Sequence, residues 1–138
     1  MTLAQTLILA SAAIVFVLGA GHLYLTYFSH KLHPRDRELS ARLQQAPPMI
    51  SAETTYWRAT VGFHVSHSIG ALFFGLLYGY LAVAEPGFLF HTPFIAALGL
   101  LLLLSKLTLA RLYWFSTPLL GLGVATACYI SGLVIVAG

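Results

Sequence analysis

The sequence predicts an all-α integral membrane four-helix bundle. Apolar residues make up 59% of the 138 positions. Charged residues make up only 8%, about a third of the share found in soluble domains. The apolar residues also fall into blocks that are too long for a soluble core, so the bilayer is expected to complete the fold. A chain of this length predicts a single domain, residues 1–138.

Four of these blocks approach or exceed the roughly 20 residues that cross the hydrocarbon layer. They run from about Leu3 to Phe28, from Tyr56 to Val83, from Pro93 to Ala110 and from Leu119 to Ala137. Helices are expected because the bilayer offers no water to unpaired backbone groups. The first block has no basic flank and is longer than the core of a signal peptide, so we expect a retained helix.

The basic residues predict the orientation of the four spans. All seven Lys and Arg residues lie in or beside the first and third connections: Lys31, Arg35, Arg37, Arg42, Arg58, Lys106 and Arg111. The positive-inside rule places these connections in the cytoplasm and both termini in the periplasm. The basic residues form no groove-binding stripe, so the expected partner is the lipid bilayer and not a nucleic acid. We expect a multi-pass protein of a bacterial inner membrane.

The first connection predicts a short amphipathic helix on the cytoplasmic side. His33–Glu38 resembles a helix start, with an early proline and acids in the first turn. Leu39 and Leu43 are four residues apart and give this helix one apolar face. Pro47-Pro48 ends it, and Ser51 is expected to cap the second span. A capped linker that touches headgroups is favoured over a lid that closes a cytoplasmic entrance.

Three histidines at membrane depth are the candidate site. An ionisable side chain is costly there and rarely lacks a partner or a role. His64 and His67 share one face of the second span, and His22 lies at a matching depth in the first, roughly 10 Å inside the boundary. We expect a histidine-lined pocket near the cytoplasmic side, in which Thr26 and Ser68 are the nearest hydroxyls able to orient the rings.

Several ligands suit such a site. Three imidazoles, from His22, His64 and His67, suit a transition metal. Two imidazoles on different helices suit a haem, whereas a quinone- or lipid-like ligand or a proton relay needs only one or two. No intramembrane carboxylate accompanies the histidines, which argues against a di-iron site. No catalytic residue is identified, and whether the protein is an enzyme stays open.

The alternative is an accessory or assembly subunit with purely structural histidines. Interhelical polar bonds are ordinary in membrane bundles and average about 0.6 kcal/mol. Small residues that let helices approach closely recur along the second span, at Gly62, Gly70, Gly75 and Gly79. These positions predict contacts with other helices, within the chain, in a homo-oligomer or in a larger membrane complex.

Four segments also resemble those of a known group. Thr54–Arg58 followed by Gly62–Gly70, together with the Gly21-His22 pair and Arg111–Phe115, is similar to a group of small, uncharacterised bacterial four-helix membrane proteins. The resemblance covers most of the chain and implies the fold but no activity. That group often carries asparagine at the position of His64, which makes His22 and His67 the stronger candidates.

Overall fold

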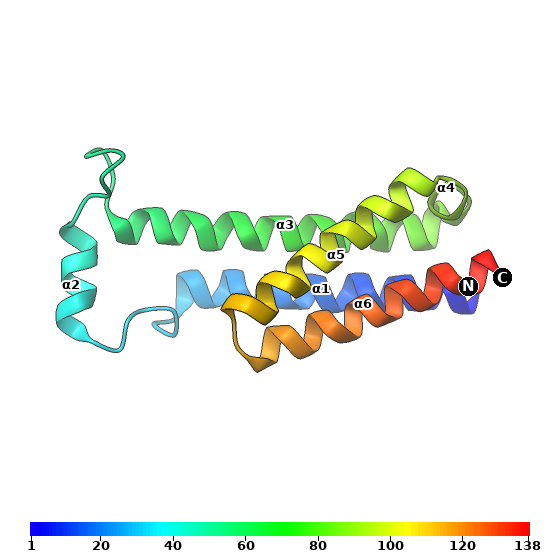
Figure 1. Ribbon diagram of the computed structural model, residues 1–138, viewed down its shortest axis with the longest axis horizontal. Coiled ribbons are helices and arrows are strands. Elements are labelled where there is room, and N and C mark those ends of the chain that lie inside the picture. Colours follow the sequence, from blue (N-terminus) through cyan, green and yellow to red (C-terminus); the bar gives the residue numbers. More distant parts are fainter. The chain divides into compact units, whose positions relative to one another are not determined.

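The computed structural model describes all residues 1–138, and every regular element in it is a helix (Figure 1). The helices are α1 (Leu3–Phe28), α2 (Arg37–Gln45), α3 (Tyr56–Ala84), α4 (Pro86–His91), α5 (Pro93–Tyr113) and α6 (Ser116–Ala137). Four of them, α1, α3, α5 and α6, are long and apolar enough to cross a membrane. This confirms the all-helical prediction with four candidate spans and suggests a multi-pass membrane protein.

The chain packs as two compact units, which are described separately. One unit comprises Met1–Leu18 and Ala71–Gly138, and the other comprises Gly19–Gly70. Helices α1 and α3 contribute a segment to each unit. The single domain expected from the chain length stays a prediction.

Close approaches of backbone hold the first unit together. A Cβ built on Gly75 of α3 would lie 2.5 Å from the Phe16 Cβ and 2.9 Å from the Ala12 carbonyl oxygen of α1. A Cβ on Gly132 of α6 would lie 3.1 Å from the Ala4 carbonyl oxygen, also of α1. Ordinary contacts between carbon atoms are about 3.5–4.0 Å, so a side chain at Gly75 would overlap α1, and one at Gly132 would fit only if its neighbours on α1 shifted by a few tenths of an ångström. The Gly132 contact also brings the end of α6 beside the start of α1 (Figure 1).

Two buried tyrosines tie α5 to its neighbours in this unit. The Tyr78 hydroxyl of α3 donates to the Ile95 carbonyl at 2.8 Å, and the Tyr129 hydroxyl of α6 donates to the Ala96 carbonyl at 3.1 Å. Their rings meet edge to face, with centroids 5.6 Å apart. Gly99 of α5 faces them, and a Cβ there would overlap the Tyr129 hydroxyl. The first turn of α5 is therefore anchored by both helices.

The second unit contains the end of α1, α2 and the start of α3. Helix α2 begins at Arg37, later than its predicted start around Pro34, because the Asp36 carboxylate accepts the backbone N–H groups of Glu38 at 2.9 Å and Leu39 at 3.2 Å. Aspartate is a preferred N-cap, so Pro34 remains in the preceding connection. No residue of α2 is buried, and its apolar face contacts no core of the chain.

The predicted cap of the second span is wrong. Ser51 Oγ accepts the Glu53 N–H inside the connection at 3.2 Å, because α3 begins five residues later. Thr55 takes the capping position, and its Oγ1 accepts the Arg58 N–H at 3.3 Å.

Helix α4 was not expected from the sequence. Its segment starts with Pro86, and proline is favoured at the first helical position because its φ angle is already helical. Leu89 of this short helix is fully buried in the core of the first unit. The segment resembles a turn in sequence, and one buried leucine is too few apolar positions to show a helical period.

Candidate functional site

The second unit brings together the three histidines of the candidate spans α1 and α3. His22 Nε2 of α1 and His64 Nδ1 of α3 form a hydrogen bond of 3.0 Å. The centroids of these two rings are 5.0 Å apart, and the His67 ring meets the His22 ring edge-on at 5.4 Å. All three side chains are half-buried. The position of His22 opposite the two α3 histidines follows from the spacing of three that puts His64 and His67 on one helix face and from the matching depth of the two segments.

The pair of bonded rings has a defined chemistry. A neutral imidazole carries one N–H and one acceptor nitrogen, so a single proton lies between His22 Nε2 and His64 Nδ1. In one tautomer the proton belongs to His22 and the outer nitrogen of His64 is a donor. In the other, the proton belongs to His64 and its outer nitrogen is an acceptor. The protonation of one ring therefore determines what the other presents.

The two hydroxyls predicted beside the site bond to backbone. Thr26 Oγ1 donates to the His22 carbonyl at 2.8 Å, and Ser68 Oγ donates to the His64 carbonyl at 3.0 Å. Ser68 is fully buried. Hydroxyls on helices commonly bond to the carbonyl four residues earlier in this way. They fix the local backbone of both histidines, and their donated protons are not directed at the ring nitrogens.

The geometry does not fit a metal or a haem. Within residues 1–138, no group of three or more His, Cys, Asp or Glu side chains is arranged to hold a metal ion. A metal–imidazole bond is about 2 Å long, so an iron between two opposed imidazoles separates their nitrogens by about 4 Å. His22 and His64 are already in direct contact at 3.0 Å. Metal binding by His22, His64 and His67 stays a prediction that this arrangement does not favour.

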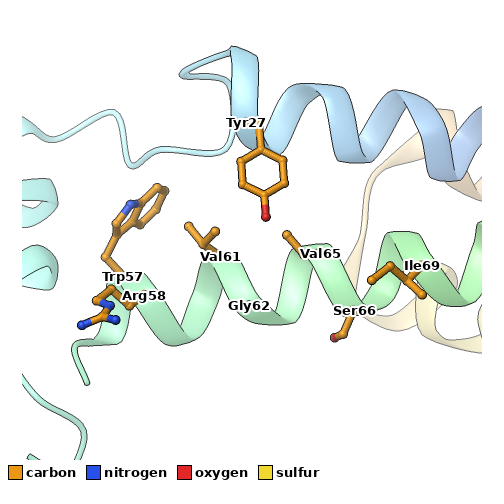
Figure 2. Close-up of a pocket in the computed structure, with 8 residues that line it drawn as sticks. All are labelled: Tyr27, Trp57, Arg58, Val61, Gly62, Val65, Ser66 and Ile69. Carbon is orange, nitrogen blue, oxygen red and sulfur yellow. The ribbon is translucent and has the colours of Figure 1, made fainter. Parts of the chain in front are cut away.

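A groove of about 500 Å³ lies on the face of α3 next to the one that carries His64 and His67 (Figure 2). Its wall from α1 is Tyr27, whose ring extends toward α3 (Figure 2). The remaining lining residues come from α3: Trp57, Arg58, Val61, Gly62, Val65, Ser66 and Ile69. None of the three histidines lines it, so the pocket present in the second unit is not the histidine-lined pocket that the sequence predicts.

Sequence reasoning missed this groove, although its signal was present. The small residues of the second span predict contacts with other helices, but a Cβ on Gly62 has no atom within 4 Å, and the same holds for Gly70. Within the chain, the packing prediction is therefore correct for Gly75 and Gly79 only. An arginine directly after an interfacial tryptophan, followed by small and apolar residues, is the pattern that points to the groove.

His33 lies in the connection between α1 and α2. It is half-buried, and its ring packs on Trp57, with centroids 4.1 Å apart. His30 lies behind it at 5.1 Å. The start of α3 brings Trp57 next to the connection that carries both histidines, a contact that local sequence patterns do not contain.

Comparison of the chain with protein-family models, with curated proteins and with solved structures finds no match. The resemblance to small bacterial four-helix membrane proteins therefore stays a prediction. The geometry of the second unit is what bears on function.

Proposed function

We propose that this protein is a multi-pass protein of a bacterial inner membrane that binds a quinone- or lipid-like ligand at His22, His64 and His67. The observation that carries the proposal is the 3.0 Å hydrogen bond between His22 and His64, in two helices that are long and apolar enough to cross a membrane. Intramembrane ionisable residues are functional candidates by default, because hydrocarbon penalises them.

The proposed orientation puts this site on the cytoplasmic side. All seven Lys and Arg residues lie in or beside two connections on one side of a four-span chain. The positive-inside rule then assigns both termini to the periplasm and α2 to the cytoplasmic surface. In this orientation the short helix rests among the headgroups, with its apolar Leu39 and Leu43 toward the bilayer.

An organic ligand suits the histidines better than a metal. The outer nitrogen of His64, Nε2, is a donor in one tautomer of the His22–His64 pair and an acceptor in the other. A quinone carbonyl accepts a hydrogen bond, and its reduced hydroxyl donates one, so either form finds a matching tautomer. The half-buried rings stay within reach of a ligand that arrives through the bilayer.

The test is to identify what copurifies with the protein. The full chain is purified in mild detergent, extracted with organic solvent and analysed by mass spectrometry, alongside an absorption spectrum and elemental metal analysis. We expect an isoprenoid quinone or lipid in near-stoichiometric amount, lost in His64→Ala and His67→Ala. His91→Ala is the matched control, since the His91 ring bonds to the Gly87 carbonyl in α4, outside the histidine group.

Two results would contradict the ligand proposal. An organic extract that is unchanged in both histidine variants would show that the imidazoles do not hold the ligand. A stoichiometric metal or haem that depends on His64 and His67 would show that the rings rearrange around an ion.

The second candidate function is an accessory or assembly subunit. It is favoured by one specific observation: a Cβ on Gly62 or Gly70 has no neighbour within 4 Å, so this face of α3 has room for a helix of another chain. In that case Gly70→Leu lowers the mass of the detergent-solubilised assembly while the ligand content of the purified protein stays nil. Gly123→Leu, at another open position on α6, is the control.

A further inference from the structure

We infer that the groove between Tyr27 and the start of α3 is a binding site for one anionic phospholipid, whose phosphate lies at Arg58 and whose acyl chain runs along α3 toward Ile69. This site is separate from the proposed function, because its lining contains none of the three histidines.

The mouth of the groove carries the groups that recognise a phosphate ester. Arg58 is exposed, and the ion pair found in this unit joins Arg42 to Glu38 and leaves the Arg58 guanidinium to other partners. Guanidinium is the side chain best suited to phosphate oxygens. Trp57 stands at the same end as Arg58, and the Tyr27 hydroxyl points across the groove toward α3 between Val61 and Val65 (Figure 2). Tyrosine and tryptophan are typical of the headgroup level of a bilayer.

Trp57 is a fixed wall of this mouth. The His33 ring packs on it at a centroid distance of 4.1 Å, and His30 supports His33 at 5.1 Å. A side chain held in this way loses little conformational entropy when a ligand contacts it, which favours binding. The connection between α1 and α2 thus shapes the entrance of the groove.

Beyond the mouth the groove becomes apolar and smooth. Val61, Val65 and Ile69 follow one another at intervals of four residues along one face of α3. Gly62 contributes no side chain, and no atom lies within 4 Å of where its Cβ would be. Ser66 adds a hydroxyl, but that hydroxyl donates to the Phe63 carbonyl at 2.9 Å and is therefore satisfied by its own helix. Such a surface accepts a hydrocarbon chain without leaving a polar group unpaired.

The length of the groove matches one leaflet. Arg58 and Ile69 are eleven residues apart on a continuous helix, which corresponds to about 16 Å. The hydrocarbon core of a bilayer is about 30 Å thick, so half of it is about 15 Å. A phospholipid with its phosphate at Arg58 would therefore extend its acyl chain along the groove to the level of Ile69, near the bilayer midplane. A soluble phosphate compound would leave this apolar part of the groove unfilled.

Charge decides which phospholipid is preferred. The second unit holds five of the seven Lys and Arg residues of the chain and three of its four acidic residues, so basic residues are in excess there. An excess of basic groups near a membrane surface favours anionic over zwitterionic headgroups, by about fivefold for each effective cation. The occupant is therefore an anionic phospholipid such as phosphatidylglycerol.

The test uses the fluorescence of Trp57. Trp114→Phe leaves Trp57 as the one tryptophan of the full chain, which is reconstituted into phosphatidylcholine vesicles. Brominated phosphatidylglycerol and brominated phosphatidylcholine, at equal mole fractions, then report which lipid contacts Trp57 through quenching. We expect the phosphatidylglycerol to bind several-fold more strongly, Arg58→Gln to remove most of this preference, and Gly62→Leu to weaken quenching by both brominated lipids.

Matched variants separate the groove from the histidine site and from a contact between two copies of the chain. Arg42→Gln removes a cation that is already paired with Glu38, and it should keep the preference. His64→Ala should keep it as well, so the groove and the histidine site can fail independently. Equal quenching by the two brominated lipids in the parent protein would overturn the inference. So would a retained preference in Arg58→Gln, or a Gly62→Leu variant that changes oligomeric mass but not quenching, which would assign the groove to a second copy of the chain.

Discussion

Replacing Gly75 with alanine adds one methyl group where two helices have no space for it. The new Cβ would lie 2.5 Å from the Phe16 Cβ and 2.9 Å from the Ala12 carbonyl oxygen. Carbon contacts normally begin at about 3.5 Å, so α1 and α3 must separate by roughly 1 Å in the first unit. Backbone cannot yield as a flexible side chain can. Overpacking of this kind typically costs about 1–3 kcal/mol.

Gly70→Ala is the matched control on the same helix. Its Cβ would meet nothing within 4 Å, and alanine raises helix propensity by about 1 kcal/mol at both sites. That gain cancels in the comparison, so Gly75→Ala should be less stable than Gly70→Ala by about 1–3 kcal/mol. Denaturation by SDS in mixed micelles, followed by circular dichroism, measures the difference. Equal unfolding midpoints for the two variants would refute the claimed closeness of α1 and α3.

Three further predictions concern the orientation of the chain, the cap of α2 and the anchoring of α5. A C-terminal fusion to a reporter that is active only in the cytoplasm should be dark, and a strong signal would reverse the proposed orientation. Asp36→Ala should speed amide exchange at Glu38 and Leu39, since it removes a cap worth about 0.5–2 kcal/mol, while the unfolding of the transmembrane helices stays unchanged. Tyr129→Phe should lower the free energy of unfolding by about 0.6 kcal/mol through loss of the bond to Ala96, and a neutral variant would show that this bond is not formed.

The transmembrane helices were predictable because length and hydropathy alone define them. The first span matches the predicted range from Leu3 to Phe28, and the second ends one residue beyond Val83. Depth and helix period were also enough to bring His22 near His64 and His67. Length, hydropathy and helix period are one-dimensional properties of the sequence, and a bilayer converts them directly into structure.

The features that the sequence did not predict depend on contacts between segments. The hydrogen bond between His22 and His64 depends on how both helices are rotated about their axes, and hydropathy does not specify this rotation. The stacking of His33 on Trp57 joins a connection to a helix across many residues. Whether Gly62 meets a neighbour or open space depends on what covers α3, and the pattern of small residues is the same in both cases.

The anchoring of α5 has a consequence for how its position is specified. Leu100 to Leu104 are identical side chains that encircle the helix, and such a surface packs almost equally well after a rotation by one residue. Gly99 removes this degeneracy, because only in one rotational setting does a position without a side chain face the tyrosine rings. The hydroxyls of Tyr78 and Tyr129 then fix the axial shift by reaching the carbonyls of Ile95 and Ala96. The absent side chain of Gly99 and the two tyrosine hydroxyls therefore specify the rotation and the axial position of a helix whose leucines are interchangeable.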